Sequence, residues 1–568
     1  MIFSSKKTRH SDINPDEIFL DFSNIPQFDT HQFEGRMERP LSKTALLVLW
    51  FFFSGVITLF FVRIANLELK EGSTLRAHAE NNRLNEITLF AERGAIFDRK
   101  GIQLASNAPS SKEEFSARVY SHKSGLAHVV GYVSYPALDT SGFYYKKEYD
   151  GVSGVEYAYD AFLKGVNGAV LVEANAQGEV EQQSVTTRPK DGENILLAID
   201  ARVQEELFIR IREIAETRGF AGGAGVIMDV ETGEILALTS FPEYNSQTLT
   251  DGGKASIEEF LNDKGNPFLS RASAGLYAPG SIMKPILAIA ALQEQLISPE
   301  EKIESTGSIS IPNPYYPGKV SVFRDWKAHG WVDMRDALAV SSDVYFYEIG
   351  GGYKERSGLG IGKIEAYMKL FGFGRTTGID LSHEEVGLIP TPQWKEKIFG
   401  EDWRLGDTYN TSIGQYGFQV TPLQAVRAVA AIANNGKLVT PRLVKKFFSD
   451  TEISTGVKET PIISEKLPLD PASYAVVREG MRRAVQRGTA TGLNIPAVAV
   501  AAKTGTAEIG TAKKYVHSWI TGFFPYEKPR YAFAVVLERG PSGNLIGALY
   551  AFRGLLEWMA EYTPEYIK

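Results

Sequence analysis

Residues Gly275–Leu292 read GLYAPGSIMKPILAIAAL, an apolar helix with a proline just inside its start. A proline in the first helical turn costs little, because the amide that it lacks would have had no intrahelical partner. Pro285 therefore predicts that a buried helix begins here. Ser281 then lies near the helix N-terminus, where backbone N–H groups and the helix dipole favour negative charge, and Lys284 at i+3 lies on the same face.

This spacing predicts a serine nucleophile that a lysine activates. The lysine acts as a base only when it is neutral, and lowering its pKa from about 10.4 to about 7 takes about 4–5 kcal/mol. Burial alone shifts a lysine by about 3–5 pK units, so an apolar cleft with a second cation nearby is sufficient. S-x-x-K is a weak pattern, and its second copy, Ser4 to Lys7, has no apolar helix behind it. Alone, the motif leaves open that Ser281 merely starts a helix.

Two later motifs favour the catalytic interpretation. The segment LAVSSDVYFY places Ser341 and Asp343 at the end of a helix-like stretch. The segment AVAVAAKTGTAEIG places Lys503, Thr504 and Gly505 after an apolar run that we expect to form a central strand. S-x-x-K, then S-x-N or S-D-N, then K-T-G is the motif order of penicillin-binding proteins and serine β-lactamases.

Longer segments carry a more specific resemblance. ERGAIFDRKGIQLASN (92–107) and GVSGVEYAYDAFLKGVNG (151–168) resemble the membrane-proximal pedestal of the class B penicillin-binding proteins. NPFLSRASAGLYAPGSIMKP, GDTYNTSIGQYGFQVTPLQ and AAKTGTAE resemble their transpeptidase domain. The chain is thus similar to this family, specifically to its elongation-type penicillin-binding protein 2 members. The resemblance implies an α+β transpeptidase domain, an antiparallel sheet flanked by helices, on a mixed, elongated pedestal.

The resemblance also implies a reaction. Ser281 would attack the carbonyl between the last two D-alanines of a peptidoglycan stem peptide and form an acyl-enzyme, while Lys284 takes its proton. Ser341 would relay a proton to the departing D-alanine in concert with Lys503, whose charge also attracts the substrate carboxylate. An amine from a neighbouring stem peptide then forms the cross-link.

The same family implies a substrate-binding strand. Thr504 and Thr506 would hydrogen-bond the substrate carboxylate or backbone, and Gly505 would let the substrate lie along the strand as an added β-strand. The backbone N–H groups of Ser281 and Thr506 would form the oxyanion hole, in which one donor is worth about 2.7–4 kcal/mol.

Asp343 departs from the asparagine of many relatives, although elongation-type members resemble this sequence here. A carboxylate beside Lys284 would favour the charged lysine, which is the opposite of what a base needs. We therefore hypothesise that Asp343 points to Lys503 or to a substrate amide, and not to Lys284.

An uncharged segment predicts a membrane anchor. Residues 44–62 span about 28 Å as a helix, close to the hydrocarbon thickness of a bilayer. A cleavable signal peptide is the competing interpretation, but the preceding sequence is long for one. Because peptidoglycan lies outside the cytoplasmic membrane, we divide the chain into a cytoplasmic tail (1–43), the anchor (44–62), an extracytoplasmic pedestal (63–190) and the transpeptidase domain (191–568).

Local patterns predict elements of the last domain. Asp200 caps a helix that carries Val203, Leu207 and Ile211 on one face and ends near Gly219. We expect strands in GAGVIMDV, EILALTS, SWITGFFP and RYAFAVVLE, and a closing helix over 548–562. Three tryptophans are interpreted as core or cleft-wall residues: Trp331, Trp394 and Trp403.

Composition excludes several classes of function. The 568 residues carry a net charge of -7 and no basic block, which argues against nucleic-acid binding. There is no cysteine, so disulfides, thiol nucleophiles and thiolate metal sites are excluded. The eight histidines are far apart in sequence, and we expect neither a metal nor a cofactor unless dispersed ligands converge.

The expected partners follow from the resemblance. They are stem peptides, lipid-linked glycan strands, β-lactam inhibitors and a membrane-embedded glycosyltransferase of the shape, elongation, division and sporulation (SEDS) family. Only about 20 residues separate QLASN from HVVGYVS, where the family inserts a larger block, so the pedestal is trimmed and the docking mode is open. Alternative functions are a septal transpeptidase, a D,D-carboxypeptidase, a β-lactamase, a β-lactam sensor and a catalytically inactive scaffold.

Overall fold

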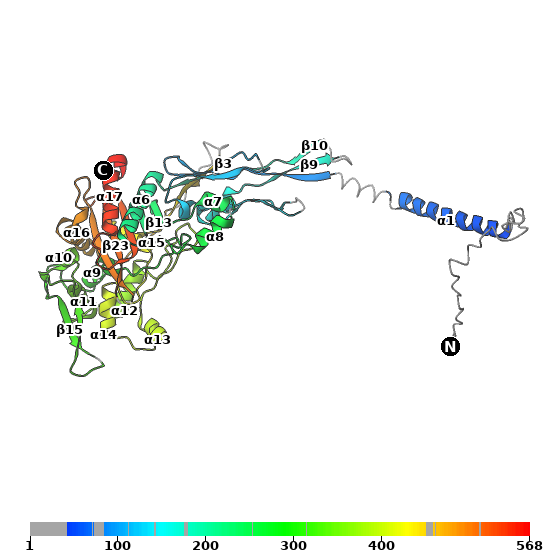
Figure 1. Cartoon of the computed structure of the whole chain (residues 1–568). Coiled ribbons are helices and arrows are strands. Elements are labelled where there is room, and N and C mark those ends of the chain that lie inside the picture. The colour runs from blue at the N-terminus through cyan, green and yellow to red at the C-terminus, as the bar shows by residue number, and fades with distance from the viewer. Residues whose placement is uncertain are drawn as a thin grey trace, which may run out of the picture. The chain divides into compact units, whose positions relative to one another are not determined.

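A computed structural model describes most of the chain (Figure 1). The described residues are 43–70, 72, 84–111, 113–140, 144–174, 180–252, 254–313, 315–449, 458–459, 462–510 and 513–568. They fall into two compact units, one with the N-terminal helix and the other with residues 86–172 and 181–568. Nearly all of the predicted tail lies outside the described residues.

Helix α1 (Lys43–Leu69) contains the predicted anchor and continues beyond it. Its segment Leu46–Leu69 is long and apolar enough to cross a membrane, and none of that segment is buried within the protein. The helix therefore has the length and composition of a single transmembrane span.

The region after the anchor consists of short strands and helices. Its strands are β1 (Leu84–Leu89), β2 (Ile96–Phe97), β3 (Gln103–Ala108), β4 (Ala117–Tyr120), β5 (Val133–Ser134), β6 (Ala137–Leu138), β7 (Tyr144–Lys146), β8 (Asp150–Gly151), β9 (Gly168–Ala174), β10 (Val180–Thr187) and β11 (Asn194–Leu197). Its helices are α3 (Ala127–Val130), α4 (Gly154–Ala158) and α5 (Asp160–Leu163). At its centre, Glu156 is fully buried and accepts hydrogen bonds from Arg93 at 2.6 Å and Arg118 at 2.8 Å.

This region shares a sheet with the C-terminal part of the chain. The order of the six strands is β20-β19-β11-β2-β3-β4, where β19 is Val444–Phe448 and β20 is Lys458–Glu459. Strand β11 pairs in parallel with β2 and antiparallel with β19. Main-chain pairing therefore crosses the position at which we divide pedestal from transpeptidase domain.

The remaining elements belong to the transpeptidase region. Its strands are β12 (Gly222–Asp229), β13 (Ile235–Phe241), β14 (Ile303–Ser305), β15 (Ser308–Pro312), β16 (Val320–Arg324), β17 (Gly330–Val332), β18 (Lys437–Val439), β21 (Ser464–Lys466), β22 (Ala501–Ile509), β23 (Tyr515–Phe524) and β24 (Tyr531–Pro541). Its α-helices are α6 (Ala201–Arg218), α7 (Ser246–Thr250), α8 (Lys254–Asn262), α9 (Lys284–Gln293), α10 (Met334–Val340), α11 (Asp343–Gly351), α12 (Gly360–Leu370), α13 (Pro392–Phe399), α14 (Leu405–Ser412), α15 (Pro422–Ala433), α16 (Pro471–Arg487) and α17 (Ala548–Tyr562). Its 3₁₀ turns are η3 (Gly280–Met283), η4 (Thr491–Leu493) and η5 (Pro564–Tyr566).

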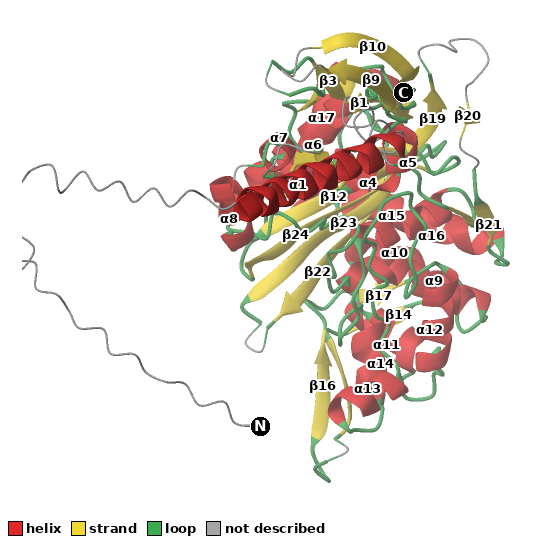
Figure 2. Cartoon of the chain, turned by 90° about the vertical axis from the view of Figure 1, so that its right-hand side faces the viewer, coloured by secondary structure: helices red, strands yellow, loops and turns green. Residues whose placement is uncertain are grey.

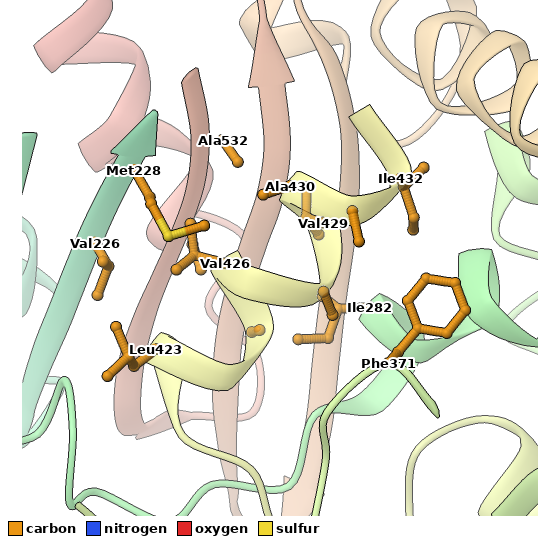
Figure 3. Close-up of a cluster of buried hydrophobic side chains, with 14 of the residues drawn as sticks. Val226, Met228, Ile282, Phe371, Leu423, Val426, Val429, Ala430, Ile432 and Ala532 are labelled. Atoms are coloured by element: carbon orange, nitrogen blue, oxygen red, sulfur yellow. The ribbon is translucent and has the colours of Figure 1, made fainter. Parts of the chain in front are cut away.

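A five-stranded antiparallel sheet in the order β13-β12-β24-β23-β22 organises this region (Figure 2). Alternate residues of a strand face opposite sides, and Val226 and Met228 pack with α15 whereas Ile227 packs with α6 and α17. Figure 3 shows α15 lying on the sheet, with Val426 beside Met228. The expected α+β fold, an antiparallel sheet between helices, is confirmed.

The ends of the predicted helices are also confirmed. The Asp200 side chain accepts a hydrogen bond from Arg202 N at the start of α6, and Gly219 ends that helix in the left-handed conformation. Helix α17 has the predicted bounds. The structure differs at one strand. Strand β22 begins only at Ala501, contains the K-T-G motif itself, and lies at the edge of the sheet and not at its centre.

Candidate active site

The candidate nucleophile, Ser281, lies in the 3₁₀ turn η3, which continues directly into α9. Pro285 occupies the start of that helix, as predicted. Gly280 donates its N–H to Gly414 O at 2.9 Å, and the loop around Gly414 thus borders the site. A Cβ atom on Gly280 would lie 2.9 Å from Thr506 O, so the turn packs closely against β22.

Two fully buried lysines flank the hydroxyl group of Ser341. Lys284 Nζ lies 2.8 Å from Ser341 O and 3.3 Å from Ser341 Oγ. Lys503 Nζ lies 2.8 Å from the same Oγ. The first lysine comes from α9 and the second from β22, so Ser341 connects the two elements.

The position of Asp343 contradicts our hypothesis. Its Oδ1 accepts a hydrogen bond from Lys284 Nζ at 2.6 Å, in an ion pair whose lysine is buried and whose carboxylate is largely buried. The backbone explains this position. Ser341 ends α10 in the left-handed conformation, with φ 59°, and Ser342 caps α11, whose first residue is Asp343. The turn thereby brings the carboxylate to the lysine of α9.

The electrostatics also differ between the lysines. Burial lowers the pKa of Lys503 well below its usual range, and the positive charge of Lys284 acts in the same direction. Asp343 opposes this shift with a smaller effect. Because the carboxylate is bonded to Lys284, Lys503 is the lysine of the pair without a carboxylate partner among the described residues. The structure thus favours the neutral form for Lys503, whereas the sequence predicts it for Lys284.

Gly505 faces the nucleophile turn. A Cβ atom at this position would lie 2.8 Å from Ile282 Cγ2 and 2.9 Å from Pro279 O. Contacts this short force a neighbour to move. The glycine therefore permits β22 to pack against the turn that carries Ser281, a role that the sequence does not predict.

The two threonines of the strand differ in exposure and in hydrogen bonding. Thr504 Oγ1 forms a hydrogen bond with Thr489 Oγ1 at 2.7 Å and is partly buried. Thr506 is exposed. Because β22 is an edge strand, one of its two sides pairs with no other strand among the described residues, which is the geometry required for an added substrate strand.

Two features of the surroundings were not foreseen. The carboxylate of Asp325 is fully buried and accepts a hydrogen bond from Ser342 Oγ at 2.9 Å, a contact for which the sequence has no local signature. Trp331 in β17 is 63% exposed, so the core interpretation is wrong for this residue, whereas the cleft-wall interpretation stays a prediction. Trp394 and Trp403 are half-buried and pack edge-on against Tyr416.

Family models match the two folded regions. The model "Penicillin binding protein transpeptidase domain" matches residues 223–551, and the model "Penicillin-binding Protein dimerisation domain" matches residues 111–197. With the fold and the three motifs, this match shows that the chain belongs to the penicillin-binding protein transpeptidase family.

Individual relatives are more specific. The peptidoglycan D,D-transpeptidase MrdA of Haemophilus influenzae is 31% identical, over 79% of this chain and 70% of that protein. Penicillin-binding protein 2 of Helicobacter pylori, solved in complex with MreC, is 27% identical with a TM-score of 0.68, covering 84% of this chain and 99% of that one. A chain of a peptidoglycan synthase complex that coordinates polymerization and crosslinking is 25% identical with a TM-score of 0.70, covering 91% of this chain and 98% of that one.

Proposed function

We propose that this protein is an elongation-type peptidoglycan D,D-transpeptidase that cross-links stem peptides through an acyl-enzyme on Ser281. The observation that carries the proposal is the convergence of the three motifs: the Ser281 turn packs on β22, and the Ser341 hydroxyl bridges Lys284 and Lys503. Similarity to MrdA supports the elongation role over the septal alternative.

Acylation begins with the attack of Ser281 Oγ on the carbonyl carbon between the last two D-alanines. The proton of Ser281 passes to Lys284. Ser341 delivers a proton to the departing amine of D-alanine as the C–N bond breaks, and Lys284 restores the proton of Ser341. The backbone N–H groups of Ser281 and Thr506 stabilise the oxyanion. Such a preorganised donor contributes about 2.7–4 kcal/mol to the transition state.

The ion pair between Lys284 and Asp343 requires a step before attack, because a protonated lysine cannot accept the proton of Ser281. We infer that the substrate carboxylate, on binding near Lys503, favours the charged form of that lysine. One proton then moves from Lys284 Nζ to Ser341 Oγ while the Ser341 proton moves to Lys503. The result is a neutral Lys284 beside the nucleophile, with the number of protons unchanged.

Deacylation completes the cross-link. The amine of a neighbouring stem peptide attacks the acyl carbon, and the ester bond to Ser281 Oγ breaks as the new amide bond forms. The proton that the amine loses returns to Ser281 Oγ. The donor peptide lies along the open side of β22, where Thr506 is exposed for its recognition and Thr504 is held by Thr489.

The same reaction defines the location and the partners. Helix α1 anchors the protein in the cytoplasmic membrane, with the tail in the cytoplasm and the catalytic region outside, where peptidoglycan lies. The similarity to a chain of a peptidoglycan synthase complex supports a glycan-polymerising partner of the SEDS family, and the Helicobacter pylori complex supports a partner of the MreC kind. Lipid-linked glycan strands supply the stem peptides, and β-lactams acylate Ser281.

A transfer assay tests the proposal. The full-length protein in detergent is incubated with a fluorescent penicillin, and separately with a stem-peptide donor and a labelled D-amino-acid acceptor. We expect penicillin labelling and acceptor incorporation, both lost in Ser281→Ala and both retained in Ser4→Ala, the matched serine of the second S-x-x-K copy. Hydrolysis without transfer would indicate a carboxypeptidase, and wild type without any label would indicate a scaffold.

A further inference from the structure

Asp325 lies directly against the turn that carries Ser341. It follows strand β16, and its side chain is fully buried. Its Oδ2 accepts hydrogen bonds from Ser342 Oγ at 2.9 Å and from Val344 N at 3.0 Å. The same oxygen lies 3.2 Å from Ser305 Oγ of β14.

The turn needs an external support. Ser341 has a φ of 59°, a left-handed conformation that is unfavourable for a residue with a Cβ atom and persists only where the surroundings enforce it. The two groups that Asp325 binds flank Asp343 on either side, at Ser342 and Val344. One buried carboxylate therefore fixes the backbone from which both Ser341 and Asp343 project.

The partners of Asp325 are hydrogen-bond donors rather than a lysine or arginine. Oδ1 accepts from Trp326 N at 2.8 Å and lies 3.5 Å from His329 Nε2. Burial lowers the pKa of His329, so this imidazole is neutral near pH 7. No lysine or arginine within the described ranges forms an ion pair with Asp325. The carboxylate thus anchors the turn through its hydrogen bonds.

We propose that Asp325 is a positioning residue for transpeptidation, which holds Ser341 Oγ between the amines of Lys284 and Lys503. This inference rests on the proposed function. Asparagine is a poor replacement, because both oxygens of Asp325 accept hydrogen bonds from backbone N–H groups, and the amide NH₂ would face one of these donors.

Acylation kinetics of the full-length protein with benzylpenicillin test the inference. The experiment measures the dissociation constant of the initial, non-covalent complex separately from the acylation rate constant. We expect Asp325→Asn to lower the rate constant by about tenfold or more while the dissociation constant stays within about threefold, because misplacing a reacting group by about 1 Å costs on the order of 100-fold. The double variant Asp325→Asn/Ser342→Ala should lose no more than Asp325→Asn, since both changes remove the same contact.

Asp200→Asn is the matched control. The Asp200 side chain is also fully buried and also accepts a hydrogen bond from a backbone N–H in the first turn of a helix, but its partners are Arg202 and Tyr566. We expect this variant to lose thermal stability and to keep the acylation rate constant. Folded Asp325→Asn with a wild-type rate constant, or an equal loss of rate in Asp200→Asn, would overturn the inference.

A third variant tests the inference if Asp325→Asn does not fold. Ser342→Ala removes one of the anchored groups and should lower the acylation rate constant several-fold, whereas a wild-type rate constant in this variant would overturn the inference. Failure of the proposed function has a separate signature, because the wild-type protein itself would then not be acylated.

Discussion

Replacing Lys503 with methionine is expected to stabilise the protein while abolishing acylation. The lysine is fully buried, and Asp343, the carboxylate of this cluster, is bonded to Lys284 instead. Lys503 Nζ has two neutral hydrogen-bond partners, Ser341 Oγ at 2.8 Å and Thr504 O at 2.9 Å. Methionine is unbranched and flexible, so it fits the same space without requiring a hydrogen bond.

The gain in the free energy of unfolding cannot exceed the cost of deprotonating Lys503 when the wild-type protein folds. With an ordinary pKa of 10.5, that cost at pH 7.5 is about 4 kcal/mol, and we take this limit because the burial is complete. The two lost hydrogen bonds offset about 2 kcal/mol. The variant should therefore be more stable than wild type at pH 7.5, by up to about 2 kcal/mol.

The gain should depend on pH in a defined direction. Because burial lowers the pKa of Lys503, the unfolded chain binds more protons than the folded protein, and wild-type stability rises with pH toward 10.5. At pH 9.5 the deprotonation cost is only about 1.4 kcal/mol, which the two lost hydrogen bonds outweigh. The advantage of Lys503→Met should therefore disappear at that pH.

Chemical denaturation at pH 7.5 and 9.5 measures these differences, with Lys284→Met as the control. That variant removes the partner of a largely buried carboxylate, and we expect it to lose about 3 kcal/mol. If Lys503→Met is destabilised at pH 7.5, or if its offset from wild type is the same at both pH values, our account of the buried lysines is wrong.

Three further substitutions test neighbouring parts of the structure. Asp343→Asn should slow acylation by about tenfold or more, since a hydrogen bond to a charged group is worth about 1.5–3 kcal/mol; a loss of a few-fold in a fluorescent-penicillin time course would show that the charge is dispensable. Gly505→Ala should lower both the melting temperature and the acylation rate, because its Cβ would lie 2.8 Å from Ile282 Cγ2 and overpacking costs about 1–3 kcal/mol; unchanged values would contradict the packing role. Burial raises the pKa of Glu243 from 4.5 to about 7, so the folded protein binds the proton more tightly and wild-type stability should fall by about 3 kcal/mol as the pH rises through this range. The stability of Glu243→Gln should not fall in this way. The same pH dependence of stability in the variant and in wild type would contradict this prediction.

The parts of the fold that the sequence predicts are those with local causes. Helix α6 begins at a side chain that caps it and ends at a glycine in the left-handed conformation, and both signals lie within the helix or next to it. Pro285 marks the start of α9 for an equally local reason. The three motifs are recognisable because each is a short run of neighbouring residues in the sequence.

The contacts between the motifs depend on the tertiary structure. The left-handed turn at Ser341 sets the direction of the Asp343 carboxylate. A serine in the sequence does not predict such a turn. Asp325 reaches that turn from the loop that follows strand β16, with no spacing rule to connect them. The edge position of β22 depends on the order of five strands, and an apolar run reads the same at the edge as at the centre.

The central claim is that Ser281 carries the acyl group. Mass mapping of proteolytic fragments after incubation of the full-length protein with benzylpenicillin tests it most directly. We predict one adduct, on the fragment that contains Ser281, and none in Ser281→Ala. An adduct that maps to any other residue, or one that persists in Ser281→Ala, would contradict the account.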